Sequence, residues 1–375
     1  FFFQNMIRGR LLRLGRQRSS LAGAVPVIDL AGPSERVASE VASSCAEWGF
    51  FEVVNHSIDD ALVDAFEEQS RAFFELPLER KRALKRSASN ARGFFDDELT
   101  KRRRDWKEAL DFGVPGSRDW STADNDLANG CLDGYNRFPD AALLSSFRPV
   151  MTRYFDALTG LSERIAALMA SGLGMPPDYS KRFGEGHTSY LRLNYYPPCS
   201  ELGPPPPLGI SPHRDAGFLT VLKQDPNCHS LQVARKSDGE WCTVVPTPGA
   251  FTINTGDMAQ IWSNDRYHAP EHRVLTSADR RRYSAPFFYN PGYRTNVEPL
   301  PTLGAPRFSP CVWGYYRAQR FAGDFADFGT EIQISDFAIG SRSPHLERQA
   351  DFVARADVSL PFSVEEYRHL LEMPD

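Results

Sequence analysis

Apolar positions in the first half of the chain recur mostly at helical spacing, interrupted by two short strands. Strand-like runs occupy residues 25–30 and Trp48 to Val54. Helical spacing follows the first run, then extends from Ala61 to about Leu84 and from Ala141 to about Leu173. Residues 86–140 contain several Gly and Pro breakers, so we expect loops there. This half is therefore predicted to be mainly helical.

After residue 186 the pattern changes to short runs of β-branched and aromatic residues separated by turn signals. The runs lie at 188–196, 217–224, 230–234, 241–245, 250–254, 258–263, 272–275 and 282–289. Short strands at near-regular spacing are typical of a β-sandwich or barrel. We therefore predict a mainly β protein with flanking helices, in which a helical N-terminal portion packs on an all-β core.

Composition narrows the class of protein. The chain has 375 residues, of which 41% are apolar and 24% charged, as in ordinary globular proteins. No apolar run approaches the roughly 18–20 residues of a membrane-spanning helix. The formal charge of −5 argues against a protein that holds nucleic acid by its overall field. We expect a monomer with neither nucleic-acid nor membrane partners.

The N-terminal residues have a composition of their own. Residues 1–28 contain five arginines and no acidic residue; leucines lie between the arginines, and two serines follow them. This composition is typical of an organellar transit peptide, although a disordered basic extension would have it too. We expect a cytoplasmic protein, in which residues 1–24 are a basic extension. A mitochondrial or plastid location is the alternative if these residues act as a transit peptide.

Candidate chemistry begins with a histidine and an aspartate in the β-rich half. His213 and Asp215 are two residues apart, and on a strand such residues share a face. One imidazole and one carboxylate are two-thirds of a facial triad for non-haem iron(II). His268 and His272 are the downstream candidates for the third ligand. Four residues of strand span roughly 13 Å, so one ion cannot bind both, and His272 is the one flanked by strand formers.

Two further polar pairs have the same i, i+2 spacing. Arg282 and Ser284 follow His272, and a guanidinium beside a hydroxyl is suited to gripping a buried carboxylate. Asn194 and Tyr196 form the other pair in the run 188–196. If the barrel closes, these pairs and the His213 pair converge on one pocket.

These residues, in their order and spacing, resemble those of the iron- and 2-oxoglutarate-dependent dioxygenases of the isopenicillin N synthase-like class. The resemblance covers roughly residues 24–295. It is carried by VPVIDL at 25, WGFFEVVNHSI at 48, FFELPLERKRAL at 73, LRLNYYPPC at 191, GISPHRDAGFLTVL at 209, LQV at 231, PGAFTINTGDMAQIWSNDRYHAPEHRV at 248 and RYSAPFFYNP at 282.

The resemblance implies a role for each matching residue. His213, Asp215 and His272 correspond to the iron ligands. Arg282 and Ser284 correspond to the grip on the distal carboxylate of 2-oxoglutarate, with Tyr196 assisting and Asn194 near the cofactor. The implied activity is oxidation of a C–H bond of a small organic metabolite by hydroxylation, desaturation or ring closure. It uses Fe(II), 2-oxoglutarate and O2 and releases succinate and CO2. The implied fold is a double-stranded β-helix, or jelly roll, with helices around it.

The chain departs from the class in two places. Arg214 stands between two ligands where a small or polar residue is usual, and the region after about 295 matches no motif of the class. Two alternatives therefore stay open, an iron-dependent oxidase that does not use 2-oxoglutarate and a non-catalytic small-molecule receptor. The expected divisions are a basic leader at 1–24, an N-terminal helical and strand region at 25–140, a helix plus catalytic core at 141–295, and a C-terminal segment over the substrate pocket at 296–375.

Overall fold

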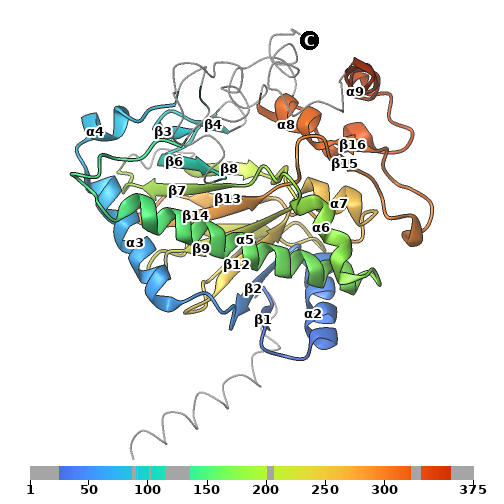
Figure 1. The fold of residues 1–375 in the computed structure, drawn as a ribbon, viewed down its shortest axis with the longest axis horizontal. Coiled ribbons are helices and arrows are strands. Elements are labelled where there is room, and N and C mark those ends of the chain that lie inside the picture. The colour runs from blue at the N-terminus through green and yellow to red at the C-terminus, as the bar shows by residue number, and fades with distance from the viewer. Residues whose placement is uncertain are drawn as a thin grey trace, which may run out of the picture.

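Two β-sheets with helices around them make up the protein in a computed structural model (Figure 1). The structure describes residues 25–86, 90, 92–100, 103–114, 136–200, 207–321 and 331–355. The expected leader at 1–24 lies outside the described residues. The prediction of a sheet-rich protein with flanking helices is confirmed. Across the described ranges, no helix is long and apolar enough to cross a membrane.

The larger sheet has eight strands in the order β1-β2-β12-β9-β14-β7-β6-β3, and the smaller has four in the order β11-β10-β13-β8. Two-stranded sheets pair β15 with β16 and β4 with β5. The strands are β1 Val27–Asp29, β2 Phe50–Val54, β3 Gly93–Phe95, β4 Leu99–Thr100, β5 Arg103–Arg104, β6 Glu108–Gly113, β7 Tyr190–Tyr196, β8 Leu208–His213, β9 Leu219–Gln224, β10 Leu231–Ala234, β11 Trp241–Thr243, β12 Phe251–Thr255, β13 His272–Leu275, β14 Arg282–Tyr289, β15 Asn296–Val297 and β16 Cys311–Val312.

Helices cover the outer face of the larger sheet, and α5 runs across it (Figure 1). The helices are α2 Ser34–Glu47, α3 Asp60–Glu75, α4 Leu78–Arg82, α5 Phe147–Gly172, α6 Lys181–Gly184, α7 Asp257–Trp262, α8 Trp313–Phe321 and α9 Pro344–Arg355, with 3-10 turns at Pro177–Ser180, Pro301–Leu303 and Ile334–Phe337.

The buried apolar side chains form two clusters. The larger lies between the eight-stranded sheet and helices α2, α3 and α5, where Phe155 of α5 packs edge-on against Phe287 of β14. The smaller joins strands of both sheets and includes Phe50, Tyr196 and Val274. The inner faces of the two sheets therefore face each other across this second cluster.

Four predictions about individual elements need correction. The helix expected from Ala61 to Leu84 is two helices, because Pro77 forces the preceding Leu76 into an extended conformation. The strand expected at 258–263 is helix α7, since a short apolar run does not distinguish a strand from a buried helix. The expected loops at 86–140 contain β3 to β6, and β6 is a buried strand paired with β7 along its length. The helix expected from Ala141 begins later, at Phe147.

Candidate active site

Two histidines stand opposite each other on neighbouring strands of the smaller sheet. The antiparallel register of β8 and β13 pairs His213 directly with His272, and their ring centroids lie 4.3 Å apart. β8 ends at His213, so the expectation that Asp215 continues the same strand was wrong. Asp215 lies in the following loop, yet its carboxylate still meets the two imidazoles.

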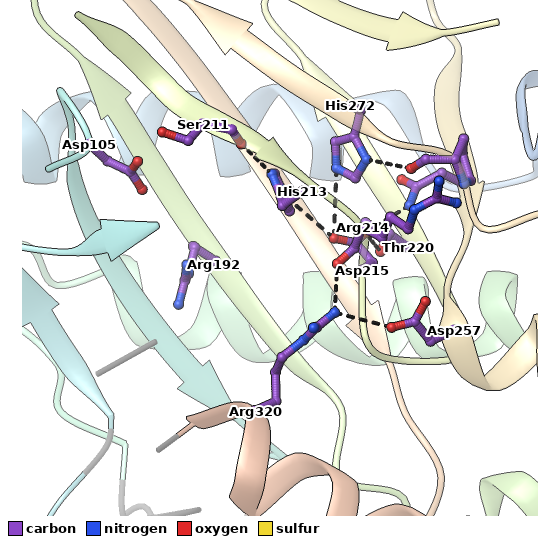
Figure 2. Close-up of polar contacts among 12 residues, drawn as sticks. Asp105, Arg192, Ser211, His213, Arg214, Asp215, Thr220, Asp257, His272 and Arg320 are labelled. Atoms are coloured by element: carbon purple, nitrogen blue, oxygen red, sulfur yellow. Dashed lines mark hydrogen bonds and ion pairs between the residues drawn. The ribbon is translucent and has the colours of Figure 1, made fainter. Parts of the chain in front are cut away.

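The three side chains converge on one point (Figure 2). Asp215 Oδ1 lies 3.7 Å from Nε2 of His213 and 3.7 Å from Nε2 of His272. One ligand atom from each of the three residues lies within 4.8 Å of the others, the only such group of three in the described part of the chain. His268, the other candidate, is outside this group, and its backbone instead bonds Cys45 and Thr255.

Both imidazoles are held with Nε2 toward that point. Nδ1 of His213 lies 2.8 Å from the carbonyl oxygen of Ser211, and Nδ1 of His272 lies 3.2 Å from that of Pro270. A carbonyl oxygen only accepts hydrogen bonds, so each Nδ1 carries the proton and each Nε2 presents a lone pair. Burial, followed by the neighbouring His272, lowers the pKa of His213 to about 3, which keeps its ring neutral.

Asp215 is oriented by two neutral donors that the sequence analysis missed. Thr220 Oγ1 and Asn254 Nδ2 donate to its Oδ2 at 2.6 and 2.7 Å, which leaves Oδ1 for the two imidazoles. Burial alone would raise the pKa of Asp215, but His272, His213 and these two hydrogen bonds lower it. An Asn within a short run of strand formers, as in β12, was the available signal.

The pair expected to grip 2-oxoglutarate lies on β14, next to β7. The register sets Arg282 opposite Tyr196 and Ser284 opposite Asn194. The Arg282 guanidinium lies 4.9 Å from the Tyr196 ring centroid and donates to Ser284 Oγ at 3.2 Å. Asn194 Nδ2 lies 3.5 Å from the same hydroxyl. The two predicted polar pairs therefore form one cluster.

This cluster has unused hydrogen-bonding capacity. Arg282 is 2% exposed, pairs with no carboxylate among the described residues, and its Nε has no hydrogen-bond partner there. Asn194 Oδ1 is likewise buried without a partner. A buried, unpaired guanidinium is costly unless an anion binds it, so the cluster fits the carboxylate of 2-oxoglutarate. The two imidazoles and one carboxylate fit iron(II) in the same sense.

A second buried cluster of charges lies on the same face of β7. Arg192 grips Asp111 through Nε and Nη2 at 2.8 and 2.9 Å, and its Nη1 lies 3.1 Å from both oxygens of Glu98. Lys107 pairs with Glu98 at 2.6 Å and with Asp105 at 3.1 Å. We call these five residues the ionic cluster. It was not predicted from the sequence, because its members come from separate strands and loops.

Two family models match the chain. The model described as the 2OG-Fe(II) oxygenase superfamily matches residues 187–291, which include both clusters of predicted site residues. The model described as the non-haem dioxygenase in morphine synthesis N-terminal matches residues 25–141.

Individual relatives and structures agree with these models. Jasmonate-induced oxygenase 2 of Arabidopsis thaliana is 34% identical over 307 residues, covering 78% of each chain. Gibberellin 20 oxidase 1 of the same plant is 33% identical over 330 residues, covering 84% of this chain and 83% of that protein. The crystal structure of JOX2 in complex with 2OG, Fe and JA superposes with a TM-score of 0.68 at 33% identity, over 78% of this chain and 84% of that one.

A fungal structure extends the likeness in fold. A full-length Neurospora crassa protein, crystallised in complex with alpha-KG, gives a TM-score of 0.70 over 81% of this chain and 98% of that one. Its identity is 24%, so this likeness concerns the fold alone.

Proposed function

Because the chain belongs to the 2OG-Fe(II) oxygenase superfamily, we propose that His213, Asp215 and His272 hold the iron(II) on which its activity depends. The protein is a 2-oxoglutarate- and Fe(II)-dependent dioxygenase, an oxidoreductase that uses O2 and acts on a small organic metabolite. The single observation that carries the residue assignment is the convergence of two Nε2 atoms and one carboxylate oxygen within 4.8 Å.

The chain's own residues prepare the site before any ligand arrives. The carbonyl oxygens of Ser211 and Pro270 fix the tautomer and the ring orientation of the two histidines. Thr220 and Asn254 do the same for Asp215. When bound, iron and 2-oxoglutarate supply the oxidation, in which 2-oxoglutarate and O2 give succinate and CO2 while a substrate C–H bond is oxidised.

Arg282 and Ser284 would bind the distal carboxylate of 2-oxoglutarate. The open Nε of Arg282 and the hydroxyl of Ser284 offer donors on one face of β14, and Tyr196 lies against the guanidinium. Asn194, which shares the Ser284 hydroxyl, lies at the side of the same cluster. The apolar cluster around Phe50, whose ring packs edge-on against His272 at 5.5 Å, keeps water from this side of the site.

We infer further that the two facing sheets form a double-stranded β-helix, with its core at 141–295. The apolar cluster shared by strands of both sheets supports this arrangement. We infer that the C-terminal segment at 296–375 covers the substrate pocket, because Arg320 of its helix α8 contacts the backbone of Arg214, next to two of the proposed iron ligands. We also propose that the protein acts as a monomer, which light scattering of the purified protein tests. We propose in addition that it has neither nucleic-acid nor membrane partners.

The test of the iron site uses the spectrum of the loaded protein. Anaerobic addition of iron(II) and 2-oxoglutarate is expected to give the weak visible metal-to-ligand charge-transfer band of the chelate. His213→Ala is expected to abolish the band, whereas His229→Ala, at an exposed histidine, is the matched control and retains it. Iron binding without the band would favour an oxidase that does not use 2-oxoglutarate. An absence of iron binding would favour a receptor.

The substrate is then sought by turnover. A library of small metabolites is screened for compounds that stimulate succinate formation by the wild-type protein. The same compounds are expected to leave His213→Ala inactive. Stimulated succinate formation by His213→Ala would contradict the assignment.

A further inference from the structure

Arg320 of helix α8 reaches the loop that follows His213 and carries Asp215, which we call the ligand loop. Its side chain is buried, and Nη2 donates to Asp257 Oδ2 at 3.1 Å and to the carbonyl oxygen of Arg214 at 3.3 Å (Figure 2). Arg214 lies between His213 and Asp215. Tyr316, one helical turn before Arg320, donates its hydroxyl to the same Asp257 oxygen at 2.7 Å.

The same guanidinium also contacts Glu331 and Ile332. Nη1 of Arg320 donates to the carbonyl oxygen of Ile332 at 2.8 Å and pairs with Glu331 at 2.6 Å. One buried side chain therefore joins three parts of the molecule, which are the ligand loop, the start of α7 and the chain beyond α8. Arginine is suited to this role because its guanidinium offers several donors in a fixed plane.

Asp257 in turn is tied to the ligand loop through its backbone. Its N–H donates to the carbonyl oxygen of Asp215 at 2.8 Å, and the N–H of Met258 donates to that of Gly217 at 3.1 Å. Gly256 lies so close to this loop that a Cβ there would come within 2.7 Å of the Asp215 carbonyl oxygen. A shift of Asp257 therefore moves the backbone of a residue that carries a ligand oxygen.

We propose that Arg320 is a positioning residue of the iron site, which couples helix α8 to the ligand loop that follows His213 and holds Asp215. The inference rests on the proposed function, since it assumes that these residues bind iron. Coupling of this kind is reciprocal. Iron that orders the ligand loop also orders α8, and a stable α8 also favours the loop geometry that binds iron.

The experiment compares iron binding and the mobility of α8 in the same samples. Wild type, Arg320→Met and Arg320→Lys are titrated anaerobically with iron(II) in the presence of 2-oxoglutarate, and the charge-transfer band is recorded. Hydrogen exchange of the peptide spanning 313–321 is measured with and without both ligands. Lys81→Met is the matched control, because Lys81 forms a comparably buried pair with Glu108 at 2.5 Å.

Loading is expected to slow exchange of the 313–321 peptide in wild type and in Lys81→Met. In Arg320→Met that response is expected to vanish, and iron affinity to fall about 10-fold, the lower end of the range for residues that orient metal ligands. Arg320→Lys keeps the charge but reaches fewer acceptors, so it is expected to restore part of the affinity.

Removing Arg320 alone leaves Asp257 buried without its cation, and that variant could fail to fold. The double variant Asp257→Asn/Arg320→Met removes both charges and keeps the test decisive. A wild-type exchange response and wild-type iron affinity in either variant would overturn the proposal. The wild-type band reports on the proposed function separately, so a protein that shows the band without α8 coupling refutes only this inference.

Discussion

Two arginines on one face of the larger sheet, the half-buried Arg192 and the buried Arg282, differ in what they bind. Arg192 on β7 donates to the carboxylates of Asp111 and Glu98 through all three guanidinium nitrogens. Arg282 on the neighbouring strand has the Ser284 hydroxyl and the Tyr196 ring, and its Nε has no partner in the described ranges. A guanidinium already paired with carboxylates is part of the fold, whereas an unpaired one marks a place for an anionic ligand.

The comparison is tested most strongly by removing Arg192. Arg192→Met removes a cation that pairs with the buried carboxylates of Asp111 and Glu98. Breaking an ion pair of this kind costs about 3–5 kcal/mol of unfolding free energy. Urea unfolding measures this loss. Arg36→Met, which removes an exposed pair with Glu40, is the control and is expected to change stability by about 1 kcal/mol or less.

If Arg192 instead bound 2-oxoglutarate, Arg192→Met would raise the KM for 2-oxoglutarate while stability stayed near that of wild type. That result would reverse the roles assigned to the two arginines.

The converse variant is Arg282→Met. It removes at least one hydrogen bond to a bound carboxylate, worth about 1.5–3 kcal/mol, so the KM for 2-oxoglutarate is expected to rise by at least roughly 10- to 150-fold. Unfolding free energy is expected to change little or to rise, because an unpaired buried charge is removed. An unaltered KM together with a large loss of stability would show that Arg282 is structural.

Asn254 allows a similar distinction at the iron site, between a residue that orients a ligand and an exposed one. Asn254→Ala removes one of two hydrogen bonds to Asp215 Oδ2, and iron affinity is expected to fall about 10-fold, as for other groups that orient metal ligands. Titration of iron(II) in the presence of 2-oxoglutarate measures this change. The control is Asn227→Ala, at an exposed turn residue, and equal affinities in both variants would remove Asn254 from the site.

The polar pairs assigned to the 2-oxoglutarate site could be grouped from the sequence because their spacing is local. Arg282 and Ser284, like Asn194 and Tyr196, are two residues apart on one strand, and the period of a strand puts each pair on one face. His213 was singled out by its i, i+2 spacing to Asp215, and His272 was preferred to His268 because of its strand-forming neighbours. The mainly β architecture followed from short runs at near-regular spacing.

The supporting residues could not be predicted because their partners are distant in sequence. Arg192 lies 81 residues from Asp111 and 94 from Glu98, and only the pairing of strands in space brings them together. Arg320 and Asp257 are 63 residues apart. The break at Pro77 is different, since the rule that proline disfavours helix in the preceding residue was available from the sequence.

The smallest expected effect is the loss of unfolding free energy at acid pH. It distinguishes the two arginines because, among the described residues, Arg192 pairs with carboxylates and Arg282 does not. Burial would raise the pKa of Glu98, but Arg192, Lys107 and Arg86 lower it well below its ordinary value of 4.5. In the unfolded chain Glu98 takes up a proton near pH 4.5, whereas in the folded protein it stays ionised, so unfolding is favoured as pH falls below that value. Glu98→Gln takes up no proton, and its unfolding free energy is expected to decline less between about pH 6 and pH 4 than that of wild type.

Arg282 has no carboxylate partner among the described residues, so Arg282→Met is expected to keep the wild-type decline in urea unfolding at the same two pH values. If Glu98→Gln declined as steeply as wild type, the ionic cluster would not be the source of this acid sensitivity.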